Sequence, residues 1–248
     1  MSIRVVGGSD QGLVRKNNED SYTVLPVGES AALLIVADGV GGHAFGEVAS
    51  QITVAVFEQL VKQGKLDAGT NDHDLREMLL SMAAHKAHVD VSKKATEDKT
   101  HNGMACTLTG VLCDSSSYTL VQVGDSRLYH FGEKGLTKIS EDQTVAQELL
   151  AAGRISPAQY DVHPDKGVLS QSIGLESIDQ PLEAVVTTHE WQKGDVLVAC
   201  SDGLSDMVSD ESIEKVLHEQ GAEPAALIQA ALDRGGKDNV TVAIAVNQ

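Results

Sequence analysis

The chain has 248 residues and a formal net charge of −17, and 42% of its residues are hydrophobic while only 3% are aromatic. A surface this acidic repels the phosphates of nucleic acids and of anionic membranes, which argues against proteins that bind either through charge. The hydrophobic content is enough for one large core built from Val, Leu, Ile and Ala.

Cysteine usage and hydropathy indicate the compartment. The three cysteines, Cys106, Cys113 and Cys200, lie in apolar strand-like segments and form no C-x-x-C pair, which is typical of buried, reduced thiols and argues against zinc. No apolar run reaches membrane-spanning length, and the N-terminus has no signal-peptide core. We therefore expect a cytoplasmic protein, taken as a monomer because no oligomerisation signal is visible.

The predicted elements are short apolar strands and amphipathic helices. In chain order they are a strand after Asp20, a strand at 33–37, helices over 47–63 and 74–92, strands at 107–113 and 118–123, a helix over 143–152, a strand at 196–200, helices over 211–218 and 222–233, and a strand at 240–246.

The two long central helices show helical periodicity. Their predicted core-facing residues are Val48, Ile52, Val56 and Leu60 in the first, and Leu75, Met78, Met82 and Val89 in the second. The element order is not the strict alternation of a doubly wound fold, and hairpin-like neighbours such as 107–113 and 118–123 favour antiparallel sheets. These patterns predict a layered α+β sandwich, with residues 1–248 as one domain.

Four aspartates border apolar strands. Asp38, Asp125 and Asp202 follow such strands, and Asp238 precedes one. Each taken alone is most often a turn residue. Strand ends at one edge of a sheet lie close together, however, and converging carboxylates would repel each other unless a cation bound between them. Oxygen-only ligands favour Mg²⁺ or Mn²⁺ over zinc.

A basic residue precedes an acidic pair near the N-terminus. Arg15 is followed by Glu19 and Asp20, just before a predicted strand. An arginine is usually a solvated surface charge. Its guanidinium is also a natural fork for two phosphate oxygens, so Arg15 could instead hold an anionic substrate beside a metal.

Seven segments in order resemble one family across nearly the whole chain, the metal-dependent PPM (type 2C) protein serine/threonine phosphatases in their compact bacterial form. They are "SDQGLVRKNNED" (9–20), "ADGVGGHAFGEVAS" (37–50), "VGDSRLY" (123–129), "SEDQTVAQELLAAGRIS" (140–156), "HPDKGVLSQSIG" (163–174), "CSDGLSDMVSD" (200–210) and "GGKDNVTV" (235–242).

The resemblance implies a fold and an activity. The fold would be a four-layer α-β-β-α sandwich, with two antiparallel sheets flanked by helix pairs and a flap-like segment at about 141–174. The activity would be hydrolysis of phosphoserine and phosphothreonine on proteins by metal-activated water. Mn²⁺ or Mg²⁺ would be the cofactor, as two ions with a weaker third. Phosphorylated proteins and a cognate Ser/Thr kinase would be the partners.

The resemblance also assigns metal ligands. Asp38 would bridge two ions, and Gly39 would offer its backbone carbonyl, where the lack of a Cβ lets the backbone approach the ion. Glu19 would serve the second ion, largely through water. Asp202 and Asp238 would serve the first.

Three further roles follow from the same resemblance. Asp125, with Asp202, would hold the third ion. Asp20 would orient a metal-bound water. Arg15 would bind the phosphate.

Some segments depart from the family pattern. Val40 stands where animal members carry a histidine after the Asp-Gly pair, and His43 follows two further glycines. His43 would protonate the leaving group or shape the loop, with metal-bound water as the rival proton source. "MACT" (104–107) replaces the usual "MGTT", and "HPDKGVLSQSIG" lacks the usual basic pairs, which puts substrate binding in doubt.

Two alternatives remain open. The first is a catalytically inactive domain that docks a kinase or regulator, which the presence of all four expected metal carboxylates disfavours. The second is a dedicated switch that acts on one regulatory phosphoprotein, which differs in substrate and not in chemistry.

Overall fold

The computed structural model describes residues 2–28, 30–40, 45–66, 72–97, 103–174 and 182–248. Two five-stranded sheets pack face to face, and every strand pairing in them is antiparallel. The first sheet has the order β1 (Ile3–Asp10), β10 (Val240–Asn247), β9 (Val196–Cys200), β6 (Arg127–Gly132) and β7 (Gly135–Lys138). The second has the order β2 (Ser21–Val27), β3 (Ala31–Ala37), β4 (Leu108–Asp114), β5 (Ser117–Val123) and β8 (Val185–Glu190).

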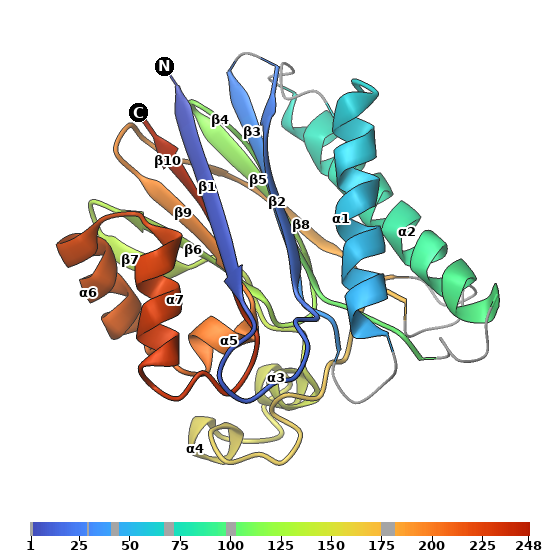
Figure 1. Ribbon diagram of the computed structural model, residues 1–248, viewed down its shortest axis with the longest axis vertical. Coiled ribbons are helices and arrows are strands. Elements are labelled where there is room, and N and C mark those ends of the chain that lie inside the picture. The colour runs from blue at the N-terminus through green and yellow to red at the C-terminus, as the bar shows by residue number, and fades with distance from the viewer. Residues whose placement is uncertain (1, 29, 41–44, 67–71, 98–102, 175–181) are drawn as a thin grey trace.

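Helices cover the outer face of each sheet (Figure 1). The long helices α1 (Gly46–Lys62) and α2 (His73–Glu97) pack on the second sheet, and α6 (Asp210–Gln220) and α7 (Pro224–Leu232) lie outside the first. The short helices α3 (Val145–Ala151), α4 (Pro157–Tyr160) and α5 (Asp202–Ser205) gather at one end of the sandwich. The predicted α-β-β-α arrangement of two antiparallel sheets is confirmed.

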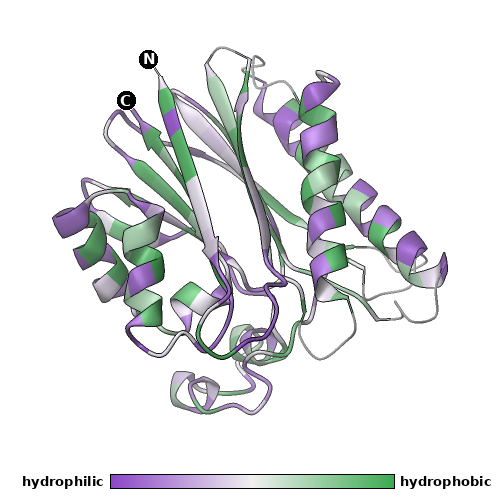
Figure 2. Ribbon diagram, viewed as in Figure 1, coloured by the Kyte–Doolittle hydropathy of each residue, from purple (hydrophilic) through white to green (hydrophobic). Residues whose placement is uncertain are grey.

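Strand β3 shows why a continuous apolar run forms a strand here. All its residues are buried. Leu33 and Ile35 point into the cluster beneath α1 and α2, whereas Leu34 and Val36 point into the layer between the sheets. A strand buried on both faces needs no polar alternation. The hydropathy colouring agrees, because hydrophobic residues concentrate on the central strands and hydrophilic ones on outer helix surfaces and loops (Figure 2).

The predicted core face of α2 is wrong. Met78, Met82 and Val89 are 51%, 61% and 44% exposed. The buried face carries Leu80, Ala83, Ala84, Ala87 and Val91 instead, together with the polar residues Arg76, His88 and Ser92. The three alanines let the helix backbone approach the sheet closely, and the methionine stripe is turned toward solvent.

The predicted face of α1 is partly right. Val56 is fully buried, whereas Val48, Ile52 and Leu60 are partly buried and pack on the edge of the same core cluster. Phe57 is fully buried and anchors the helix centre.

Four strands had no predicted counterpart, β1, β6, β7 and β8. Their sequences are glycine-containing or polar, and most of their residues are only partly buried. Antiparallel pairing with neighbouring strands holds them in place despite that weak pattern.

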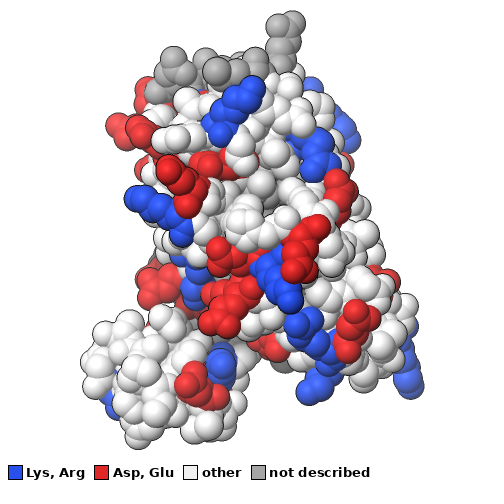
Figure 3. Space-filling model, turned by 90° about the vertical axis from the view of Figure 1, so that its left-hand side faces the viewer, with Lys and Arg blue, Asp and Glu red and all other residues white. Residues whose placement is uncertain are grey.

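Acidic and basic side chains lie side by side on the surface, although the net charge of the chain is −17. On the face seen in Figure 3, acidic side chains gather beside basic ones near the middle of the molecule. None of the helices in the described part of the chain is long and apolar enough to span a bilayer.

Candidate active site

The acidic residues at the strand ends face one cavity of about 190 Å³ at the end of the sandwich near α3 and α5. Asp38 follows β3, Asp125 follows β5, Asp202 begins α5 directly after β9, and Asp238 precedes β10. Both sheets end here, so residues far apart in sequence meet. The predicted residues that line this cavity are Arg15, Glu19, Asp38, Gly39, Asp125, Asp202 and Asp238.

Gly39 lies where no side chain fits. A Cβ atom there would lie 2.5 Å from the backbone carbon of Gly46 and 2.7 Å from the carbonyl oxygen of Glu19. The Gly39 N–H also donates to that carbonyl at 3.2 Å. This close approach exposes the backbone beside Asp38 to the cavity, as a carbonyl ligand would require.

Burial and crowding raise the pKa values of the clustered acids. Burial contributes most in each case, followed for Asp38 by the negative charges of Asp20, Asp202 and Asp125. The pKa of Asp38 lies well above its usual range, that of Asp202 rises to about 8 and that of Asp125 to about 7. Burial and neighbouring negative charges therefore outweigh the groups that favour the charged forms of these acids.

Asp20 lies behind this group. Its side chain is buried, and its Oδ2 accepts a hydrogen bond from Ser201 Oγ at 2.7 Å. Among the residues that the structure describes, its buried Oδ1 has no hydrogen-bond partner. Burial raises the pKa of Asp20 too. An orphaned acceptor beside Asp38 is suited to a donor within the cavity, such as a water molecule.

Arg15 reaches the cavity from the loop between β1 and β2. Its Nη2 lies 2.6 Å from Asp238 Oδ2. This hydrogen bond raises the pKa of Arg15. Asn239, which the sequence interpretation did not single out, fixes this loop: its Oδ1 accepts from the Glu19 N–H, and its Nδ2 donates to the Gln11 and Asn17 carbonyls, all at 2.8 Å.

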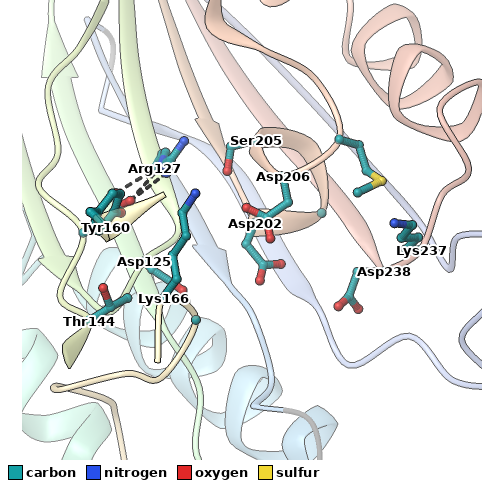
Figure 4. Close-up of a pocket in the computed structure, with 14 residues that line it drawn as sticks. Asp125, Arg127, Thr144, Tyr160, Lys166, Asp202, Ser205, Asp206, Lys237 and Asp238 are labelled. Atoms are coloured by element: carbon teal, nitrogen blue, oxygen red, sulfur yellow. Dashed lines mark hydrogen bonds and ion pairs between the residues drawn. The ribbon is translucent and has the colours of Figure 1, made fainter. Parts of the chain in front are cut away.

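A second hollow of about 450 Å³ adjoins the cavity and shares Asp125, Gly167, Asp202 and Asp238 with it. Figure 4 shows Asp202 and Asp238 facing the side chains of Tyr160 and Lys166 across this space. The predicted flap-like segment supplies one wall through Asp142, Thr144, Tyr160, Lys166 and Gly167.

In and beside this hollow lie charged residues that sequence reasoning missed. Arg127 forms an ion pair with the buried Asp142 at 2.7 Å, and Lys138 lies 3.2 Å from the same carboxylate. Asp206, four residues after Asp202, also lines the space. The only signal for Arg127 and Asp206 in the sequence was that they lie close to Asp125 and Asp202, in the same family-like segments.

The donor set fits a hard divalent cation. It consists of carboxylate and carbonyl oxygens, and the described cavity lining includes no histidine or cysteine. No group of three His, Cys, Asp or Glu side chains within the described ranges already surrounds a single point as metal ligands do. His43, the predicted proton donor, lies outside the described residues.

Comparisons with known proteins point the same way. The family model described as "Protein phosphatase 2C" matches residues 14–226. The serine/threonine protein phosphatase PstP of Mycobacterium tuberculosis is 39% identical over 98% of this chain, but the chain spans only 45% of the length of PstP. The serine/threonine phosphatase stp of Listeria monocytogenes is 31% identical over 94% of this chain and 92% of its own length.

A solved structure adds information about metals. The crystal structure of the catalytic domain of PstP in complex with two manganese ions superposes with a TM-score of 0.81, at 37% identity, over 98% of this chain and 97% of that one.

Proposed function

Because this chain belongs to the protein phosphatase 2C family, we propose that it is a metal-dependent protein serine/threonine phosphatase. The observation that carries the proposal is the convergence of Glu19, Asp38, Asp125, Asp202 and Asp238 on one cavity. A multivalent cation would hold these crowded, partly buried acids, whose pKa values are raised, in their charged forms.

The carboxylates would hold two Mn²⁺ or Mg²⁺ ions. Asp38 would bridge them, with Asp202 and Asp238 toward one ion, and with Glu19 and the Gly39 carbonyl toward the other. When bound, a pair of divalent ions lowers the pKa of a coordinated water toward neutrality.

Asp125, together with Asp202, would hold a weaker third ion. Asp20 would accept a hydrogen bond from a water in the cavity through its unpaired Oδ1.

Arg15 would bind the phosphoryl group. Its guanidinium already reaches Asp238 at the cavity wall, so the same side chain can turn toward phosphate oxygens once a cation neutralises that carboxylate. It would then offset negative charge on the equatorial oxygens as the phosphorus–oxygen bond breaks. His43 is proposed as the leaving-group acid only on the sequence pattern.

We propose phosphorylated proteins, and among them a partner Ser/Thr kinase and its targets, as the substrates. The three cysteines are free and buried, which supports a reducing compartment such as the cytoplasm. Burial raises the pKa of each thiol to about 12, so Cys200 beside the site is no nucleophile.

Hydrolysis of a phosphothreonyl peptide by the purified chain tests the proposal. Mn²⁺ is titrated in and then removed with EDTA, and the phosphotyrosyl version of the same peptide serves as control. We expect phosphate release that follows Mn²⁺ and favours phosphothreonine. A folded protein that binds Mn²⁺ but releases no phosphate would instead support the docking-module alternative.

A further inference from the structure

Thr107 lies where the strand ends carrying two of the acids meet. It is 3% exposed, lines the catalytic cavity and immediately precedes β4. Its N–H donates to the Asp38 carbonyl at 2.8 Å, and its Oγ1 accepts from the Asp38 N–H at 3.0 Å. Thr107 therefore satisfies both backbone polar groups of Asp38.

The same hydroxyl reaches a second acid-bearing turn. Thr107 Oγ1 lies 2.6 Å from Ser126 Oγ, and Ser126 is fully buried next to Asp125. Gln122 Nε2 donates to the Ser126 carbonyl at 2.7 Å, which fixes that residue in turn. A short hydrogen-bonded chain therefore runs from the Asp38 backbone to the turn that carries Asp125.

Packing fixes the threonine itself. Gly124 has φ 92°, and a Cβ atom at that position would lie 2.8 Å from Thr107 Cγ2. The methyl group therefore presses against the backbone just before Asp125. The side chain of Thr107 thus has two separable functions, with the hydroxyl bonded to Asp38 and Ser126 and the methyl packed on Gly124.

We propose that the Thr107 hydroxyl is a positioning group that fixes Asp38 relative to the Asp125 turn, so that their carboxylates are preorganised for divalent cations. Asp38 and Asp125 repel each other when charged, so a hydrogen-bonded link between their backbone segments is needed to keep them close before an ion binds. This inference rests on the proposed function, because that function assigns Asp38 and Asp125 to neighbouring divalent cations in the same cavity.

Isothermal titration of Mn²⁺ into the chelator-treated full chain tests the inference without any turnover. Thr107→Val keeps the shape of the side chain but removes the hydroxyl, which leaves the partly buried Asp38 N–H without its acceptor. We expect the Mn²⁺ dissociation constant to rise about tenfold or more, as for other residues that orient metal ligands.

Two matched variants separate the hydroxyl from packing. Thr107→Ser keeps the hydroxyl and loses only the methyl, so its Mn²⁺ affinity should stay within about threefold of wild type, short of the tenfold loss typical of residues that orient ligands. Ser126→Ala cuts the link to Asp125 while Thr107 still accepts from the Asp38 N–H, so affinity should fall severalfold. Circular dichroism checks that each variant is folded.

Several outcomes would overturn the inference. One is wild-type Mn²⁺ affinity in Thr107→Val, and another is an equal loss of affinity in Thr107→Ser and Thr107→Val. The third is unchanged Mn²⁺ affinity in Ser126→Ala. If Thr107→Val does not fold, the Ser126→Ala variant alone tests the inference. A wild-type chain that binds no Mn²⁺ overturns it as well. A wild-type chain that binds Mn²⁺ without hydrolysing phosphopeptides contradicts only the proposed activity.

Discussion

The carboxyl groups of Asp38 and Asp202 lie where their ionised forms are disfavoured. Burial and neighbouring negative charges raise both pKa values, and no basic side chain among the described residues forms an ion pair with either of them. Arg15 is paired with Asp238 instead. Such a cluster destabilises the charged state locally, and protein sites that do so are commonly functional. Each of these acids contributes to the proposed metal site through its position in the cavity more than through its own hydrogen bonds.

Arg15→Ala tests the residue assigned to the phosphate. If Arg15 binds ground state and transition state alike, KM for a phosphothreonyl peptide should rise more than kcat falls. Steady-state kinetics at saturating Mn²⁺ measure both constants. Arg4→Ala is the matched control, because Arg4 pairs with the exposed Glu223 away from the cavity and should leave both constants unchanged. A pure loss of kcat would show that Arg15 acts only in the transition state.

Helix α2 shows how packing overrides a visible pattern. The stripe of Met78, Met82 and Val89 predicts a core face, yet the face that carries Leu80, Val91 and three alanines packs on the sheet. The fully buried Arg76 at its start pairs with Asp114 and Ser117 at the β4–β5 turn, which further fixes the rotation of the helix. Neither contact is visible in a periodicity of hydrophobic residues.

A pair of α2 variants tests this orientation. Leu80→Ala opens a cavity in the core and should lower the free energy of unfolding by about 2–5 kcal/mol. Met82→Ala, on the exposed face, should change it by less than about 0.5 kcal/mol. Chemical denaturation with guanidinium measures both. A larger loss in Met82→Ala than in Leu80→Ala would contradict the orientation.

The sequence predicts strands that are buried on both faces and helices whose apolar residues recur at helical spacing. The run 33–37 becomes β3, and the long helices appear within a few residues of their ends. Strands β1 and β8 could not be predicted, because pairing with neighbouring strands stabilises them and their own composition gives only a weak strand pattern. At the site, aspartates at strand ends could be predicted. Thr107 and Asn239 could not, because their hydrogen bonds join segments that meet only in the folded sandwich.

Across the whole molecule, the clustered acids link stability to pH. In the metal-free fold the pKa values of Asp125 and Asp202 rise from the usual 3.8 to about 7 and about 8. Between pH 4 and 8 the folded chain therefore binds more protons than the unfolded chain at these positions. The stability of the fold accordingly falls as pH rises through this window.

Thermal melting in EDTA should show this dependence. Each of the two acids lowers the free energy of unfolding by at most about 1.4 kcal/mol per pH unit within the window. Asp202→Asn should flatten the profile, because it removes one titrating group. Added Mn²⁺ should stabilise the fold most at the alkaline end, where ion binding displaces no proton. A metal-free melting temperature that rises steadily from pH 5 to 8 would contradict the raised pKa values.

The most direct test of the central claim is phosphothreonyl peptide hydrolysis by wild type and Asp38→Asn, measured side by side as Mn²⁺ is titrated. The substitution keeps the size of the side chain and removes the charge assigned to bridging two ions. We predict that wild-type turnover rises with Mn²⁺, while the folded variant shows no turnover at any Mn²⁺ concentration. Near-wild-type turnover in Asp38→Asn would contradict the assignment of the cavity as the catalytic metal site.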